Sequence, residues 1–81
     1  MDKGERDIPT DIFEEENKIR VIAELPGVNE DDIRLNLNGE TLFISASRGV
    51  LRYRKQVKLP HASENIIGKL YNNGILEVIL K

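Results

Sequence analysis

Apolar and polar residues alternate one by one through most of this 81-residue chain. The alternation runs through segments 18–25, 33–38, 42–47, 51–59 and 76–81. A period of two is that of a β-strand with one buried face, because successive side chains point to opposite sides of a sheet. No segment keeps the 3.6-residue period of a standard helix. The pattern therefore predicts an all-β fold built from short strands.

Turn residues separate these segments at the expected places. Asn38-Gly39 and Asn73-Gly74 stand between apolar runs, and this dipeptide is a strong signal for a two-residue hairpin. Arg48-Gly49 predicts a third tight turn, and Pro26-Gly27 ends a strand because proline cannot donate to a ladder. Six or seven strands at roughly 8–12-residue spacing predict a two-layer antiparallel β-sandwich, immunoglobulin-like in kind.

The length and composition fit a single small domain. We expect residues 1–8 to form a flexible N-terminal tail and residues 9–81 to form the domain. The chain has no cysteine, so neither a disulfide nor a thiolate metal site can staple it. No signal peptide or transmembrane run is present in the sequence, and we expect a cytoplasmic protein.

The two parts of the chain carry opposite charge. Residues 1–32 hold 11 acidic and 4 basic side chains, whereas residues 33–81 hold 3 acidic and 8 basic ones. Complementarity within the fold and solubility are the ordinary interpretation of such a split. The alternative is head-to-tail association or a charged partner.

No arrangement of residues indicates catalysis or a cofactor. His61 is the only histidine, and it follows Pro60 in an expected loop, so it cannot join a second histidine in a metal site. The acidic run 14–16 has no partner that would make it a catalytic pair. The glycines stand singly in turns and form no phosphate-binding loop. We expect no enzyme activity, no cofactor and no metal.

One strand face is basic, with Arg52, Arg54 and Lys58 pointing to the same side. A nucleic-acid reader needs aromatic rings interleaved on that face, and Tyr53 points to the other side. We interpret the basic face as a solvated surface that discourages aggregation, and we expect neither nucleic acid nor membrane as a partner.

Two segments carry a resemblance to a known family. IRVIAELPGVNEDDI (residues 19–33) and KLYNNGIL (residues 69–76) resemble the two signature segments of small heat-shock proteins, and GETLFISAS and RKQVKLP fit between them in the same order. Lys69 stands where alanine is usual. The motif residues are Leu25, Pro26, Gly27, Asn73, Gly74 and Leu76. The resemblance covers residues 9–81 and implies an α-crystallin domain.

The chain departs from that family in its assembly parts. Arg48-Gly49 leaves no room for the long loop whose strand is exchanged between subunits, and the sequence ends at Lys81 without an Ile-x-Ile tail. We therefore expect a monomer or a weak edge-to-edge homodimer. The minimal form is also similar to the sandwich domain associated with ArsA-type ATPases and, more loosely, to the CS domain of co-chaperones.

The resemblance implies a binding module. In the family, a groove between two edge strands accepts a peptide, and by position its lining here would be Leu35, Leu37, Ile67 and Leu70; ordinary core packing is the alternative for each. Ile22 and Phe43, on outer strand faces, would be covered by the N-terminal segment or left for a partner. The leading hypothesis is an ATP-independent chaperone of stress response that binds unfolding client proteins. The alternative is an adaptor with one folded partner.

Overall fold

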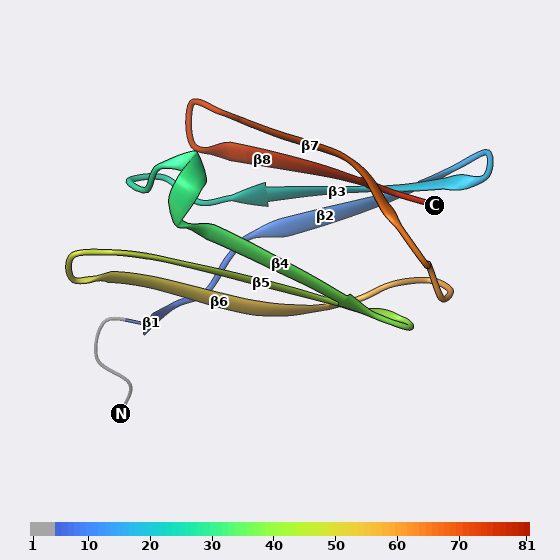
Figure 1. Ribbon diagram of the computed structural model, residues 1–81, viewed down its shortest axis with the longest axis horizontal. Coiled ribbons are helices and arrows are strands. Elements are labelled where there is room, and N and C mark those ends of the chain that lie inside the picture. Colours follow the sequence, from blue (N-terminus) through green and yellow to red (C-terminus); the bar gives the residue numbers. More distant parts are fainter. Residues whose placement is uncertain (1–4) are drawn as a thin grey trace.

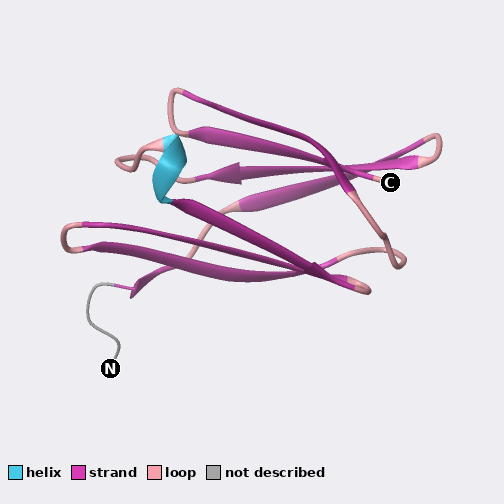
Figure 2. Ribbon diagram, viewed as in Figure 1, coloured by secondary structure: helices cyan, strands magenta, loops and turns pink. Residues whose placement is uncertain are grey.

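The computed structural model describes residues 5–81 and has two four-stranded sheets (Figure 1). Sheet A has the order β1 (Glu5–Arg6), β6 (Leu51–Lys58), β5 (Thr41–Arg48), β4 (Ile33–Asn38). Sheet B has the order β2 (Thr10–Glu15), β3 (Lys18–Glu24), β8 (Ile75–Leu80), β7 (Ile66–Asn72). One short 3₁₀ turn, η1 (Glu30–Asp32), joins the sheets between β3 and β4 (Figure 2). The prediction of an all-β, two-layer sandwich is confirmed.

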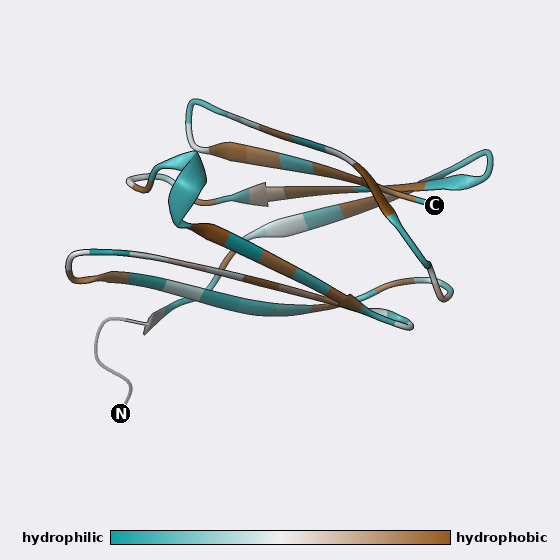
Figure 3. Cartoon of the chain, in the orientation of Figure 1, coloured by the Kyte–Doolittle hydropathy of each residue, from teal (hydrophilic) through white to brown (hydrophobic). Residues whose placement is uncertain are grey.

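The alternation seen in the sequence places one face of each central strand in the core. Figure 3 shows the alternation of hydropathy as brown and teal steps along the strands. On β3 and β8 the inward residues are fully buried and stand opposite one another, as Val21 opposite Val78 and Ala23 opposite Leu76. Leu42 and Ile44 of β5 fill the other layer. The core is therefore the dry space between the inner faces of the two sheets.

Tight hairpins fix the register of the strand pairs. The β5–β6 ladder closes on Arg48 opposite Leu51, and the β7–β8 ladder closes on Asn72 opposite Ile75. The β4–β5 ladder closes on Asn38 opposite Thr41, so the loop residues are Gly39 and Glu40, one position later than the Asn-Gly dipeptide suggested. All three tight turns are present, and each places every side chain of its strands on a defined face.

The N-terminal segment is packed earlier than we expected from the sequence. Glu5–Arg6 forms β1, which runs parallel to the start of β6, and the side chain of Ile8 is 0% exposed. Residues 5–8 of the expected tail are therefore part of the sandwich, because Ile8 supplies apolar surface to the core. Residues 1–4 lie outside the described residues. A strand of two residues has no periodicity by which a sequence could reveal it.

The edge strands of the two sheets lie in pairs on two sides of the sandwich. β1 and β2 are joined by only residues 7–9, so their sheet edges lie on the same side. β4 and β7, the opposite edge strands of the two sheets, consequently share the other side. We call this side the β4–β7 edge.

Candidate functional site

The two signature segments meet at one end of the sandwich. The Leu25 N–H donates to the carbonyl of Gly74 at 2.8 Å. Gly74 has a φ of +81°, and a Cβ there would lie 3.3 Å from the Cα of Pro26. Gly27 also has a positive φ, of +91°. Glycine is needed at both turns because the backbone there is left-handed. At Gly74 the absence of a Cβ also lets the turn approach Pro26, and this contact brings the two motifs together.

Two tyrosines hold this corner in place. The Tyr71 hydroxyl donates to the Leu25 carbonyl at 2.6 Å and lies 3.1 Å from the Val28 carbonyl. The Tyr53 hydroxyl, from the other sheet, donates to the Pro26 carbonyl at 2.6 Å. Burial, helped by the neighbouring Tyr53, raises the pKa of Tyr71 above its ordinary value. The phenol thus stays protonated and remains a donor, and the Leu25–Val28 turn is fixed beside the β4–β7 edge.

On the β4 side of that edge, the structure places Leu35 and Leu37 as half-buried residues. Their ladder partners are the buried Ile44 and Leu42, so both side chains point inward. Both are partly buried and pack against the core. That these two residues line a peptide-binding groove stays a prediction.

On the β7 side the structure corrects one expected residue. Leu70 stands opposite Glu77, whose other neighbour is Ile22, so Leu70 points to the outer face of sheet B and away from Leu35. The inward positions of β7 are those of Tyr71, opposite Leu76, and of Lys69, opposite Val78.

The start of β7 is irregular. A β-bulge separates Ile66 from Gly68 and leaves Ile67 outside the pairing. Ile66 stands opposite the buried Leu80, and both isoleucines are exposed, Ile66 by 36% and Ile67 by 51%. The Asn73-Gly74 turn is the sequence signal for which residues of β7 face inward. A two-residue turn sets Tyr71 opposite the buried Leu76, and alternation then assigns a face to each residue from Lys69 to Asn72. The edge therefore combines Leu35, Leu37, Ile66 and Tyr71.

The apolar side chains on the outer faces are interrupted by charge. Phe13 is 49% exposed and shares a cross-strand row with Arg20 and Ile79. Arg20 forms ion pairs at 3.1 Å with Glu15 and 3.2 Å with Glu77. Ile8 lies in the core, so it does not cover Ile22 on the outer face of sheet B. This outer face therefore carries apolar side chains and ion pairs side by side.

The metal-ligating side chains of the described residues do not gather into a cluster. Nε2 of His61 lies 3.2 Å from Glu14 on the surface. Among residues 5–81 no group of three or more His, Cys, Asp or Glu side chains is placed to hold a metal ion. Nor does that part of the chain contain a helix of the length and apolarity needed to cross a membrane.

Comparison with known proteins agrees with the geometry. The model of the HSP20-like domain found in ArsA matches residues 16–80. Heat shock protein HSP.16.4 of Streptococcus thermophilus is 33% identical over 91 residues, covering 90% of this chain and 64% of its own length. A probable 15 kDa heat shock protein of Leptospira interrogans is 32% identical, covering 86% of this chain and 65% of its own. The chain thus spans slightly less than two thirds of these relatives.

Solved structures show the same sandwich. The hsp14.1 protein of Sulfolobus solfataricus, as an A102D mutant, superposes with a TM-score of 0.82 at 27% identity, over 90% of this chain and 69% of that one. HspA of Xanthomonas axonopodis, at 22% identity, shares the fold with a TM-score of 0.78, over 93% and 92% of the two chains. The 91-residue match to the Streptococcus protein is longer than this whole 81-residue chain, so that relative has internal residues that are missing here.

Proposed function

Because the chain belongs to the small heat-shock protein family, as an HSP20-like domain of the form found in ArsA, we propose that it is an ATP-independent chaperone domain. Membership of this family supports a chaperone-type function. The proposed activity is to hold exposed apolar segments of unfolding proteins in the cytoplasm, without chemical conversion of the client.

The observation that carries the proposal is the β4–β7 edge. Each of its two strands ends a sheet, and half-buried apolar side chains (Leu35, Leu37, Tyr71) on these strands pack against the core. Ile66 extends the same side of β7 with an exposed side chain. Edge strands with unpaired backbone groups and adjacent apolar side chains are a surface to which an extended peptide can add.

The proposed mechanism is strand addition. An extended client segment would pair its backbone with β4 or β7 and turn alternate side chains toward the apolar side chains of the edge. Burial of apolar surface contributes roughly 25 cal/mol per Å², so a few aliphatic side chains suffice for weak, reversible holding. Backbone pairing reads no side-chain sequence, which suits a domain with many clients.

The test is light scattering of a heat-aggregating client protein mixed with an equimolar amount of this chain. We expect suppression of aggregation by the wild type and weaker suppression by Ile66→Ser and Leu35→Ser. The matched control is Leu70→Ser, which removes an aliphatic side chain of 60% exposure from the same strand but from its outer face. Circular dichroism first establishes that each variant is folded.

Two results would oppose the proposal. Absence of suppression by the folded wild type would remove the holding activity altogether. Equal loss in Leu70→Ser and Ile66→Ser would move the binding surface from the edge to the outer face of sheet B.

A second function is favoured by one specific observation, namely that the matching family form is the one found in ArsA. In this alternative the domain docks on one folded protein partner as an adaptor. The β5–β6 connection is a two-residue turn, which leaves no exchanged strand for the dimer that the resemblance implies in longer relatives. We therefore propose a monomer or weak homodimer in solution.

Affinity capture separates the two functions. The chaperone proposal predicts that captured proteins are heterogeneous and increase after heating of the extract. The adaptor predicts one stoichiometric partner, held equally before and after heating. Light scattering coupled to a sizing column tests the oligomeric state, and a particle of 12 or more subunits would exclude the monomer or weak dimer.

A further inference from the structure

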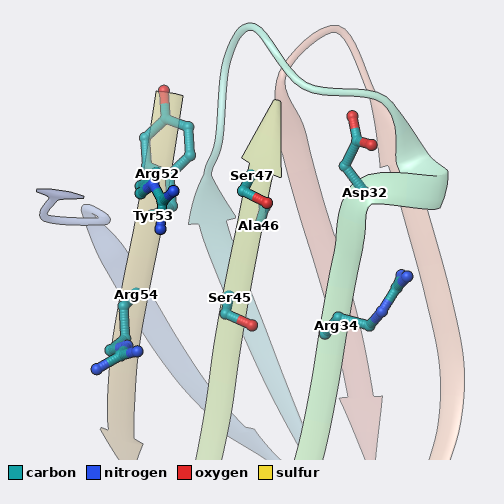
Figure 4. A pocket seen from close by; sticks show the side chains of 8 residues that line it. All are labelled: Asp32, Arg34, Ser45, Ala46, Ser47, Arg52, Tyr53 and Arg54. Carbon is teal, nitrogen blue, oxygen red and sulfur yellow. The ribbon is translucent and has the colours of Figure 1, made fainter. Parts of the chain in front are cut away.

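The outer face of sheet A is hollowed at one place (Figure 4). The cavity has a volume of about 310 Å³. Its side-chain walls and floor come from β4, β5, β6 and the end of η1, and we call it the arginine hollow: Asp32, Arg34, Ser45, Ser47, Arg52 and Arg54. It lies on the outer surface of the sheet, whereas the side chains of the β4–β7 edge point inward, so it is separate from the proposed client surface.

The strand register explains the shape. Ser45 of β5 stands between Arg34 of β4 and Arg54 of β6, and Ser47 stands beside Arg52. Figure 4 shows the two serines on the middle strand, with the arginines on the strands to either side. Short side chains on the central strand thus lie between strands that carry arginines, and the hollow has a hydroxyl floor. Figure 4 shows the Arg34 side chain extending away from the serines, past its own strand.

Several donors in the hollow are unused by the protein. Nη1 of Arg34 donates to the carbonyls of Asp31, at 2.7 Å, and Ile33, at 3.4 Å. Within the described residues its Nε and Nη2 have no protein partner, and neither does the Arg52 guanidinium. The hydroxyls of Ser45 and Ser47 likewise form no hydrogen bond with the described part of the chain. The hollow therefore offers the Arg52 guanidinium and the two serine hydroxyls as donors, and a change of the Arg34 rotamer would add Nε and Nη2 of that residue.

The charge selects an anion. Asp32 is the acidic side chain among the lining residues of the hollow. Its Oδ2 accepts the Asn29 N–H at 2.8 Å and lies 3.7 Å from Nη1 of Arg48. The guanidinium groups of Arg34 and Arg52 against one compensated carboxylate leave the hollow positive. Guanidinium forks bind carboxylates in a bidentate manner, which makes Arg the appropriate residue for such a ligand.

The dimensions favour an extended peptide over a single small anion. Arg34 and Arg52 lie two strands and two residues apart, so their Cα atoms are roughly 12 Å apart at standard strand spacings. Carboxylates on alternate residues of an extended chain are about 7 Å apart, within reach of two flexible arginines.

Nucleic acid fits less well. The aromatic residue at this position, Tyr53, is 6% exposed and its hydroxyl is turned to Pro26, so it offers no ring face for a base.

We propose that the arginine hollow binds an acidic, extended segment of a partner protein, with carboxylates on alternate residues taken by Arg34 and Arg52 and the serine hydroxyls donating from below. This goes beyond the holding of apolar segments, since the two surfaces differ in place and in chemistry. Such a surface would let the domain dock on an acidic partner while the β4–β7 edge is occupied.

The test is fluorescence anisotropy with a labelled peptide in which Glu and Ser alternate, compared with the same peptide carrying Gln for Glu. We expect binding of the Glu peptide alone, weakened by added salt. The double variant Arg34→Gln, Arg52→Gln should lower the affinity about 10-fold. The control Lys58→Gln, Lys81→Gln removes the same charge from outside the hollow and should change the affinity less than about 2-fold.

Three results would overturn the proposal: no binding of the Glu peptide to the folded wild type, equal losses in the two double variants, or displacement of the peptide by millimolar inorganic phosphate. The last result would identify a phosphate site in place of a peptide site. None of these results bears on the aggregation assay, so the hollow and the edge fail separately. The double variant Arg34→Lys, Arg52→Lys keeps the charge without the guanidinium fork. Its affinity should lie between that of the wild type and that of the Gln double variant.

Discussion

Removal of the Tyr71 hydroxyl tests whether the two signature segments are held together as the structure indicates. In Tyr71→Phe the ring stays against the core, and the donor to the carbonyls of Leu25 (2.6 Å) and Val28 (3.1 Å) is lost. One net hydrogen bond contributes about 1 kcal/mol, and a half-buried carbonyl left without its donor raises the cost to about 1–2 kcal/mol. For a domain of this size that corresponds to a decrease in Tm of roughly 5–15 °C.

Thermal unfolding followed by circular dichroism measures this effect, with Tyr53→Phe as the companion variant. Tyr53 holds the same turn through the Pro26 carbonyl at 2.6 Å, so its loss should cost about 1 kcal/mol. Because both hydroxyls restrain one turn, the double variant should deviate from additivity by about 0.5 kcal/mol or more. A decrease in Tm below about 2 °C for Tyr71→Phe, or strict additivity, would refute the idea that the tyrosines act together on this turn.

Other perturbations have equally direct outcomes. Gly74→Ala should cost about 1–3 kcal/mol in chemical denaturation, because φ is +81° and the new Cβ meets Pro26; Gly39→Ala, also at positive φ but with nothing within 4 Å, should cost less. Leu76→Ala should cost about 2–5 kcal/mol by the same measurement, since the side chain is 0% exposed. The raised pKa of Tyr71 means that the unfolded chain loses this proton first as pH rises. The stability advantage of wild type over Tyr71→Phe should therefore be constant below about pH 10 and shrink above it. An advantage that grows above about pH 10 would contradict a raised pKa in the folded protein.

The strands and the core follow from the sequence because a period of two leaves little freedom. Val21, Ile44 and Val78 each have polar or less buried neighbours on the opposite face, and each lies in the core. The exception is the segment before β2. Ile8 is buried by tertiary packing and β1 pairs through only two residues, so no local pattern revealed either.

The edge residues were harder to predict than the core because their faces depend on parity. Leu70 is apolar like Ile66 and Ile67 of the same strand, yet the Asn73-Gly74 turn sets it opposite Glu77 and so outside the edge. The bulge at Ile67 shifts the alternation by one residue, and its one trace in the sequence is Gly68, an isolated glycine inside a strand. The arginine hollow was also missed. The sequence shows Arg52 only together with the other basic residues of its own strand. The hollow arises from the pairing of Arg52 with Ser47 on the neighbouring strand, which depends on the register.

The central claim, that unfolding proteins are held at the β4–β7 edge, is tested most directly by NMR of the isotope-labelled chain with and without an unfolded client. The account predicts that amide signals broaden or shift in β4 and β7, with the Leu35 and Tyr71 amides among them, while β2 and the outer face of sheet B change little. Perturbation centred on Phe13 and Ile22, or no perturbation while aggregation is suppressed, would contradict it.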